Sequence, residues 1–266
     1  MNQNSFLAQK LIGRHHSSEV DVYQIEMPLR FYEQRPDLGD QLIKECAEIM
    51  SQVWLPKFSL EKNLFEKDLL VLFFENEKLV GFYSASFFNS YEGLACLYCS
   101  DAMILPQFQE KGLLSTAYAI TIAWATKQKN FTTKDCILMP SGSTGCFRFF
   151  ENSSLFLGVN YSSSPFADCK NVSNALSQDF VLTQISSASI IRNAWRKQDG
   201  FPQGWRMGDA LKYGFPEDVD YNNGDVFIRC YQMMNQADAE LALKIQKSIS
   251  QTEQKSQYAT WRKKEV

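Results

Sequence analysis

The sequence predicts an α/β fold in which helices flank a central sheet. Two observations predict it. The apolar run from Leu94 to Pro106 is typical of a strand, and it leads through a short loop, 107–112, directly into an amphipathic helix. Upstream, the apolar segments 69–74 and 79–88 are separated by the polar residues 75–78, which is typical of a β-hairpin. Adjacent strands followed by a helix are the parts that such a sheet requires.

The remaining elements of this region follow from the same periodicities. Apolar residues recur at helical spacing in 39–54, which predicts a first helix. The helix after the loop is expected at 113–127. A strand at 136–139, a turn at 140–143 and a helix at 144–151 follow it. The predicted order is therefore helix, hairpin, strand, helix, strand and helix.

The C-terminal part carries weaker patterns. Two segments are strand-like, 157–161 and 225–233, and they are separated by a long insertion. We expect a helix around 185–197 within that insertion and another helix from Gln236 onward, followed by a polar tail.

Composition limits the class of protein. The chain has 266 residues, of which 45% are hydrophobic and 14% aromatic, enough for one enlarged globular domain. A net charge of −3 gives no general attraction for nucleic acid or acidic membranes, and we expect neither as a partner. Because no apolar run is long enough to span a bilayer and the first residues lack signal-peptide features, we expect a cytoplasmic protein; export without such a signal stays open.

Cysteine and histidine usage argues against several kinds of site. The seven cysteines are scattered, mostly within apolar runs, as buried free thiols are. Cys96 and Cys99 form a single CxxC pair within a predicted strand, where their side chains point to opposite faces, so we expect no metal site. His15 and His16 are the only histidines, and they lie together in a polar segment. Hydrolases with a Ser-His-Asp or Cys-His arrangement are therefore not expected.

The loop 107–112 indicates a binding site. A helix begins with backbone N–H groups that have no intrahelical partner, and it carries the positive end of the helix dipole there. A strand that leads into such a loop is suited to phosphate groups. The sequence therefore predicts a phosphorylated ligand.

The residues of this loop resemble a family signature. The segment Gln109-Glu110-Lys111-Gly112-Leu113-Leu114 resembles the Arg/Gln-x-x-Gly-x-Gly/Ala pattern of the GNAT N-acetyltransferases, whose loop holds the pyrophosphate of acetyl-CoA. Leu114 departs from the pattern, because the family usually has Gly or Ala there. The predicted order of elements is also that of the family. The resemblance implies a GNAT-like mixed, mostly antiparallel central sheet flanked by helices.

The resemblance also implies a division of the chain. An N-terminal tail, 1–19, precedes a GNAT-like acyl-CoA-binding core, 20–165. A helical C-terminal elaboration, 166–266, can complete the sheet with a strand near 225–233.

The resemblance assigns the residues that bind acetyl-CoA. Backbone amides of 110–115 would meet the pyrophosphate, with the hydroxyls of Ser115 and Thr116 as further donors and Lys111 either on a phosphate or simply solvated. Main-chain groups of two strand residues would pair with the pantetheine amides. Two serines of the turn 140–143 would contact pantetheine or cap the next helix. The predicted cofactor-binding set is Met103, Ile104, Gln109, Glu110, Lys111, Gly112, Leu113, Leu114, Ser115, Thr116, Ser141 and Ser143.

Transfer to an amine requires a base. An amine with a pKa of about 10.4 is mostly protonated at pH 7, so freeing its lone pair costs about 4–5 kcal/mol. The family commonly places an acidic residue or a water chain near the fourth strand for this task. Asp101 is the first candidate because it is the only carboxylate within 94–106; Glu92, Tyr98 and water are the alternatives.

The family also uses a tyrosine of its fourth helix to protonate the departing thiolate. Aligning 143–150 with the usual Asn-x-x-Ala-x-x-x-Tyr places Phe150 at that position. The usual phenol is therefore missing, and Tyr161 or another nearby tyrosine can take its place. A core role for Tyr161 is the other interpretation.

The resemblance thus implies an N-acetyltransferase that moves an acetyl group from acetyl-CoA to a primary amine of an unknown acceptor by direct attack in a ternary complex. A module that binds CoA or an acyl-CoA without turnover is an alternative. An acyltransferase that uses a longer acyl chain is another.

Overall fold

The computed structural model describes most of the chain, including the whole of the predicted strand-loop-helix unit. The described residues are 11–15, 19–52, 54–55, 64–89, 93–129, 131–180, 185–186, 188–194, 196–197, 207–220, 223–234 and 249–250.

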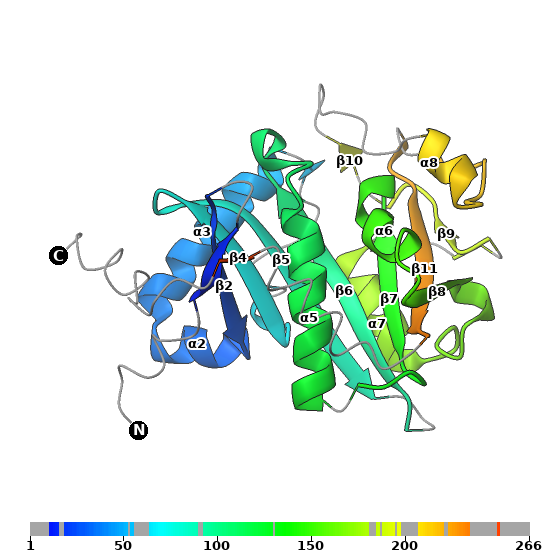
Figure 1. The fold of residues 1–266 in the computed structure, drawn as a ribbon, viewed down its shortest axis with the longest axis horizontal. Coiled ribbons are helices and arrows are strands. Elements are labelled where there is room, and N and C mark those ends of the chain that lie inside the picture. The colour runs from blue at the N-terminus through cyan, green and yellow to red at the C-terminus, as the bar shows by residue number, and fades with distance from the viewer. Residues whose placement is uncertain are drawn as a thin grey trace.

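One mixed sheet forms the centre of the molecule (Figure 1). Its strand order is β12-β1-β2-β4-β5-β6-β7-β11-β8, and β9 pairs with β11 outside this path. Every neighbouring pair is antiparallel except β6 with β7, which is parallel. The strands are β1 (Leu11–His15), β2 (Asp21–Glu26), β4 (Leu69–Glu75), β5 (Lys78–Asn89), β6 (Ala95–Ile104), β7 (Cys136–Ser141), β8 (Phe156–Asn160), β9 (Ile190–Ile191), β11 (Val226–Met233) and β12 (Ile249–Ser250).

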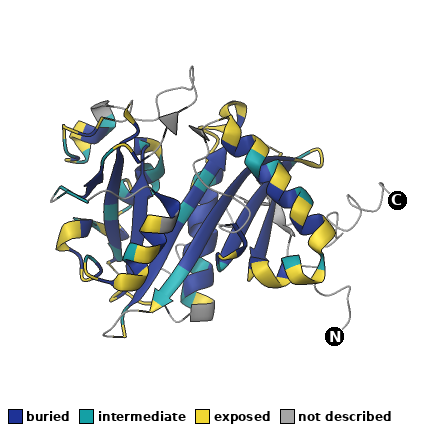
Figure 2. Ribbon diagram, turned by 180° about the vertical axis from the view of Figure 1, so that it is seen from behind, coloured by how far each residue is buried: buried dark blue, intermediate teal, exposed yellow. Residues whose placement is uncertain are grey.

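Helices cover both faces of this sheet. The helices α5 (Leu113–Lys129) and α6 (Thr144–Glu151) lie on one face, and α3 (Pro36–Ser51) and α7 (Lys170–Asp179) lie on the other (Figures 1 and 2). The shorter helices are α2 (Pro28–Gln34) and α8 (Met207–Lys212), and short 3₁₀ turns span Pro106–Phe108 and Tyr161–Ser163. Two further strands, β3 (Trp54–Leu55) and β10 (Arg196–Lys197), pair with each other in a separate small sheet.

The predicted fold class is confirmed in its architecture: the structure is a mixed, mostly antiparallel sheet flanked by helices. The helix at the start of the core, the β4–β5 hairpin, β6, α5, β7 and α6 follow one another in the predicted order. The strands predicted at 157–161 and 225–233 correspond to β8 and β11, and β11 lies between β7 and β8.

The core follows the apolar patterns. The sheet is buried along most of its length, whereas the flanking helices expose their outer faces (Figure 2). Every residue of β4 from Leu69 to Phe74 is buried, as expected for a strand covered on both faces. Among the described helices, none is long and apolar enough to cross a membrane.

The helix predicted at 185–197 is wrong. None of the described residues there is helical; four of them form β9 and β10, and Ile190 and Ile191 pair with Phe227 and Val226 of β11. Ser189 and Asn193 adopt positive φ angles of 63° and 51°, which end any helical path on both sides of β9. Tertiary pairing with β11 therefore overrides the local pattern.

Two other predictions need comment. The turn predicted at 140–143 begins later, because β7 continues through Pro140 and Ser141. The helix predicted from Gln236 and the polar tail lie outside the described residues. Ile249 and Ser250 are described, and they pair with β1.

A glycine in β5 tests how tightly β5 and β6 pack. A Cβ atom on Gly81 would lie 2.6 Å from Ile104 Cδ1 and 2.9 Å from the Met103 carbonyl oxygen. Because backbone cannot move aside cheaply, Gly81→Ala should lower the free energy of unfolding by about 1–3 kcal/mol in urea titrations. Gly145→Ala is the control, since its nearest neighbour is the Ser143 hydroxyl at 3.3 Å. Equal stability of both variants would contradict the packing described here.

Candidate functional site

A β-bulge interrupts β6 at its centre. Tyr83 pairs with Ala102 and Ala85 pairs with Cys99, so Ser84 alone lies opposite two residues, Ser100 and Asp101. The Ser84 hydroxyl donates to Asp101 Oδ2 at 2.7 Å, and the Asp101 N–H donates to Ser84 Oγ at 3.1 Å. The bulge therefore fixes the Asp101 carboxyl group in the middle of the sheet.

Strands β6 and β7 pair over only part of their length. The parallel register joins residues 96–98 to residues 136–138, and within the described strands no pair is recorded beyond Leu138. Ile228, which lies opposite Pro140, donates its N–H to Ser189 and not to β7. The Pro140 nitrogen therefore faces the β6 side, where its missing N–H costs no ladder bond. The facing edges of β6 and β7 are open beyond this point.

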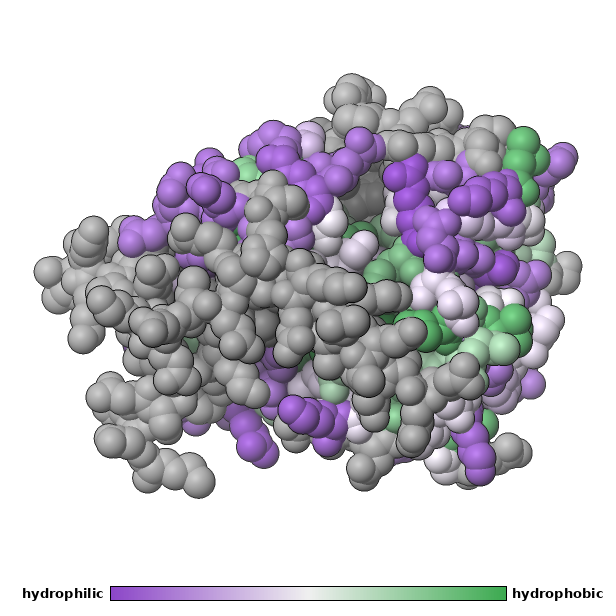
Figure 3. Space-filling model, in the orientation of Figure 1, coloured by the Kyte–Doolittle hydropathy of each residue, from purple (hydrophilic) through white to green (hydrophobic). Residues whose placement is uncertain are grey.

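This opening lies between α5 and α6. The space-filling view shows the surface hollowed between these two helices, with apolar residues beside the hollow (Figure 3). A pair of parallel strands that separate in this way leaves main-chain groups available to a ligand.

The register shows which main-chain groups face the opening. Leu105 N–H donates to the Val80 carbonyl at 3.0 Å, so Ile104 and Gly81 form a pair without mutual hydrogen bonds. The N–H and C=O groups of Ile104 therefore point away from β5 and toward the opening. The side-chain amide of Gln109 donates to the Ile104 carbonyl at 2.9 Å.

Met103 has the opposite orientation. It pairs with Phe82, and the alternation along an antiparallel ladder turns its main-chain N–H and C=O toward β5. Of the two strand residues predicted to contact pantetheine, the structure therefore presents only Ile104 to the opening. Ala102 shares the orientation of Ile104, and no pattern in the sequence indicated this, because the register depends on the bulge.

The loop before α5 has the conformation of an anion site. Glu110 and Gly112 adopt positive φ angles of 63° and 85°. Thr116 N–H is the first amide that bonds within the helix, to the Gly112 carbonyl at 3.0 Å. The amides of residues 113–115 precede it and have no intrahelical acceptor. They are the donors that the sequence predicted.

The side chains around this loop differ in their exposure. Ser115 is exposed, whereas Thr116 is buried, so its hydroxyl is enclosed by the protein. Leu113 is buried, and Leu114 packs against the core, so the bulk that departs from the family pattern is directed inward. Lys111 is exposed and its ammonium group lies 4.8 Å from the centre of the Phe108 ring.

A histidine that the sequence analysis set aside lies beside the loop. His15 of β1 is buried, and a methyl group placed on Gly112 would lie 3.7 Å from its Nε2 atom. The contact joins residues almost a hundred positions apart, so no local pattern could have indicated it.

The two predicted serines lie at the open end of β7. Ser143 caps α6, because its hydroxyl accepts from the Gly145 N–H at 3.2 Å. The Ser143 N–H donates to the Ser141 hydroxyl at 3.0 Å. Of the two predicted roles, the structure thus shows the helix cap. The hydroxyls of Ser141 and Ser143 also lie at the end of β7 that borders the opening.

Asp101 belongs to a buried polar cluster on the face covered by α3 and α7. Burial raises the pKa of its carboxyl group above the ordinary value of 3.8; Lys67 opposes this rise, and Asp179 adds to it. A buried carboxyl group with a raised pKa is suited to proton transfer. Neither Lys67 nor Asp179 was predicted from the sequence.

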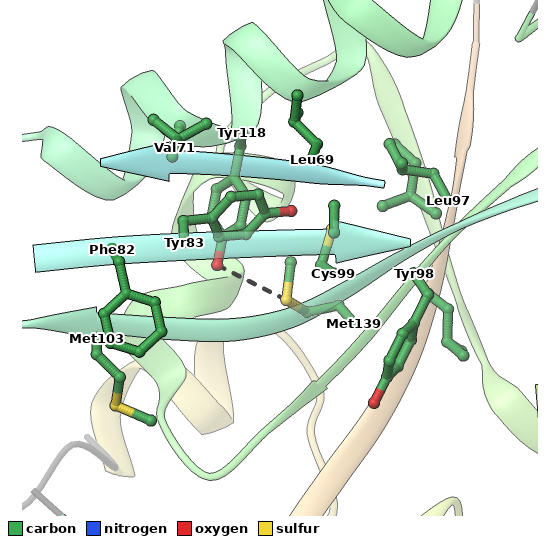
Figure 4. Close-up of a cluster of buried hydrophobic side chains, with 14 of the residues drawn as sticks. Leu69, Val71, Phe82, Tyr83, Leu97, Tyr98, Cys99, Met103, Tyr118 and Met139 are labelled. Carbon is green, nitrogen blue, oxygen red and sulfur yellow. Dashed lines mark hydrogen bonds between the residues drawn. The ribbon is translucent and has the colours of Figure 1, made fainter. Parts of the chain in front are cut away.

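The side chain of Tyr98 points away from those of Tyr83 and Cys99 (Figure 4). Its hydroxyl donates to Asp179 Oδ2 at 2.5 Å. Burial and the Asp179 carboxylate raise the pKa of Tyr98 well above its usual value. Tyr98 is therefore a hydrogen-bond donor near neutral pH and not a base.

Tyr161 lies away from the opening. It follows β8, which β11 separates from β7, so two strand spacings, about 10 Å, lie between them. Its hydroxyl is within hydrogen-bond distance of the carbonyls of Phe166 and Ala167 at 3.1 and 3.2 Å. Glu92, the other carboxylate considered, lies outside the described residues.

A different tyrosine lies beside Phe150. The Tyr118 ring of α5 is 5.0 Å from the Phe150 ring, centre to centre. Its hydroxyl donates to Met139 Sδ at 3.7 Å (Figure 4). Met139 is the first residue of β7 beyond the last pair with β6. The structure therefore brings a phenol to the point where the two strands separate.

Comparisons with known proteins find distant similarities among solved structures. No protein-family model matches the sequence, and no curated protein matches it. Among solved structures, a GNAT-family acetyltransferase from Streptococcus pneumoniae has 13% identity and a TM-score of 0.36, with 56% of this chain and 92% of that chain covered. An acetyltransferase from Clostridium acetobutylicum, solved with acetyl-CoA, has 16% identity and a TM-score of 0.29, with 44% and 79% covered. An aminoglycoside acetyltransferase from an uncultured soil sample has 15% identity and a TM-score of 0.28, with 42% and 72% covered.

The raised pKa of Asp101 should change how the free energy of unfolding depends on pH. A raised pKa means that the folded state holds the proton more tightly than the unfolded state, so ionisation of Asp101 costs stability above its ordinary value of 3.8. Asp101→Asn stays neutral. The variant should therefore gain stability relative to the wild-type protein as pH rises from about 4 toward 8, as measured by urea unfolding.

Asp37→Asn is the control with the opposite sign. The hydrogen bond from Arg35 holds the pKa of the exposed Asp37 carboxyl below 3.8, so this variant should lose stability relative to wild type once pH exceeds the folded pKa. A stability difference for Asp101→Asn that does not change with pH would contradict the raised pKa.

Proposed function

We propose that this protein is an N-acetyltransferase that moves an acetyl group from acetyl-CoA to a primary amine. The observation that carries the proposal is the opening between the parallel strands β6 and β7, which leads directly into the loop before α5. Main-chain groups of Ile104 face that opening, and unpaired helix amides follow within ten residues of it. A ligand with amides at one end and phosphates at the other fits this succession of donors and acceptors.

The loop before α5 would hold the pyrophosphate. The amides of residues 113–115 supply donors at the positive end of the helix dipole. The positive φ of Gly112 is a conformation that favours glycine directly before these amides. Lys111 and the adjacent His15 would add side-chain donors, and Ser115 would add a hydroxyl.

Asp101 would accept the proton of the acceptor amine. The nitrogen attacks the thioester carbonyl carbon, the carbon–sulfur bond breaks, and the amine proton passes to the carboxylate directly or through water. The raised pKa of Asp101 brings its proton affinity closer to that of the amine, which favours the transfer. The Ser84 hydroxyl, which donates to Asp101 Oδ2 at 2.7 Å, would stabilise the carboxylate before the transfer.

Transfer is proposed to be direct and not through an acyl-cysteine. All seven cysteines are free thiols, and Cys99 and Cys146 are the two that interact electrostatically with Tyr118. Burial raises the pKa of Cys99 to about 12 and also raises the pKa of Cys146. Neither thiol is a thiolate at neutral pH, and the thiolate is the nucleophile.

A binding module without turnover is the second candidate. The observation that favours it is Phe150, which is buried and stacked on Tyr231 with ring centres 4.6 Å apart and has no proton to donate. The two candidates share a ligand and differ in one result, the release of free CoA when a panel of amines is supplied.

Calorimetry with acetyl-CoA tests the ligand. Gly112→Glu places a carboxylate in the loop, at a position whose backbone has a positive φ. It should weaken binding about tenfold or more through charge repulsion. Gly214→Ala is the matched control, because Gly214 also has a positive φ, 66°, with no atom within 4 Å of an added Cβ. It should share the backbone strain and leave the affinity unchanged.

Saturable binding by the wild-type protein and by Gly214→Ala, with the loss confined to Gly112→Glu, supports the assignment. Unchanged affinity in folded Gly112→Glu rejects the pyrophosphate loop. No binding by the wild-type protein rejects the proposed function itself.

Tyr118 is the tyrosine that we propose for protonation of the leaving thiolate. A thiol with a pKa of about 8.5 that leaves unassisted at pH 7 forgoes about 2 kcal/mol, so Tyr118→Phe should lower kcat with acetyl-CoA about 30-fold. The loss should shrink with an acetyl donor whose thiol is more acidic, such as an acetylated nitrothiophenol. Tyr83→Phe is the control, since Tyr83 is equally buried and lies 5.3 Å from Tyr118, ring to ring. The same loss with both donors would remove Tyr118 from this role.

A further inference from the structure

A buried ion pair lies next to the Asp101 carboxyl group. Lys67 Nζ is 3.1 Å from Asp179 Oδ1, and the two side chains are 5% and 4% exposed. Lys67 lies just before β4, and Asp179 is the last residue of α7, within the segment that joins β8 to β11. The C-terminal part of the chain therefore contributes a charge to the centre of the sheet.

The hydroxyl groups of this cluster donate more short hydrogen bonds to Asp179 than to Asp101. Asp179 Oδ2 accepts from the Tyr98 hydroxyl at 2.5 Å and from the Ser100 hydroxyl at 2.6 Å. Ser100 Oγ is farther from Asp101 Oδ2, at 3.4 Å. A hydroxyl has one proton to donate, so Ser100 gives its proton to Asp179. The side-chain donor left to Asp101 at short distance is Ser84.

The charges of the cluster are also unequal. Two carboxyl groups, Asp101 and Asp179, share one ammonium group, that of Lys67. The other titratable groups that interact with Asp101 are Tyr98 on its own strand and Cys46 on α3, and both are neutral because burial raises their pKa values well above the ordinary range. With Asp179 paired to Lys67, Asp101 is the group on which a proton arrives or leaves at least cost.

We propose that the Lys67–Asp179 ion pair positions the base. It holds Asp179 where the Tyr98 and Ser100 hydroxyls donate their hydrogen bonds to it. Asp101 is thereby left as the carboxyl group that exchanges a proton with the acceptor. This inference rests on the proposed function. Lys67 and Asp179 are positioning residues, because they act through Asp101 and not on the substrate.

The charges of Lys67 and Asp179 shift the pKa of Asp101 in opposite directions. Lys67 lowers its pKa and Asp179 raises it, and the attraction of Lys67 is the larger of the two. In a buried site such interactions are only weakly screened by solvent. Removing either charge should therefore shift the titration of Asp101, and the sign of the shift identifies the partner that was removed.

The test compares Lys67→Met with Asp179→Asn. The acidic midpoint of the pH profile of kcat/KM should rise in Lys67→Met and fall in Asp179→Asn, each by about one pH unit or more. Lys67→Arg, which keeps the charge, should retain a midpoint close to that of wild type. Asp209→Asn is the matched control, since Asp209 forms a 2.7 Å ion pair with Arg148 between α8 and α6 and has no recorded interaction with Asp101. Its midpoint should not move.

A double variant guards against loss of folding. An unpaired buried charge can cost about 3–5 kcal/mol, so either single variant can unfold, whereas Lys67→Met with Asp179→Asn leaves no unpaired ion. In the double variant Asp101 is the carboxyl group that remains, and it is neutral below its own pKa. The midpoint should rise, because the larger of the two opposing effects is lost with Lys67. A midpoint unchanged from wild type in the folded single or double variants would overturn the proposal.

A second readout separates this inference from the proposed function. Isotope-edited infrared spectroscopy follows the protonated carboxyl group of Asp101 directly and needs no turnover. Opposite shifts of this signal would support the ion-pair role even in a protein that releases no CoA. Unmoved signals in an active enzyme would overturn the ion-pair role and leave the acetyl transfer intact.

Discussion

The early end of the pairing between β6 and β7 is the constraint on which the candidate site depends. Six residues of β6 continue past the last pair, and the bulge at Ser100 and Asp101 sets which of their main-chain groups face the opening. The same bulge turns Asp101 toward Ser84. One local irregularity therefore determines both the edge offered to a ligand and the position of the proposed base.

The chain sustains this irregularity by burying both sides of the sheet. On one face α5 brings Tyr118 to Met139 of β7, at the point where the strands separate. On the other, α7 brings Asp179 to Lys67 and Tyr98. Asp101, Tyr98 and Lys67 thus each have a partner from a different element, which opposes rearrangement of the strands around them.

The elements of the core could be predicted from the sequence because their signals are local. Alternating or continuous apolar residues indicated the hairpin and β6, and the glycine after a polar loop marked the start of α5 near Gly112. The segment around Ile190 could not be assigned correctly, because its conformation is decided by pairing with β11 and by the left-handed residues beside it.

The site was predictable to a similar extent. The loop before α5 and Asp101 lie in one continuous segment, so the sequence could place them together. The orientations of Ile104 and Met103 depend on hydrogen-bond register, which composition does not reveal. Lys67 and Asp179 are 112 residues apart, and only the fold brings them together.

Amide hydrogen exchange with and without acetyl-CoA would test the central claim most directly, because it reports individual main-chain groups. The account predicts slower exchange on binding at the amides of Ala102 and Ile104 and at residues 113–115, with little change at Met103, whose N–H already faces β5. Unchanged exchange at Ala102, Ile104 and residues 113–115 in saturating acetyl-CoA would contradict the assignment of the opening between β6 and β7 as the cofactor site.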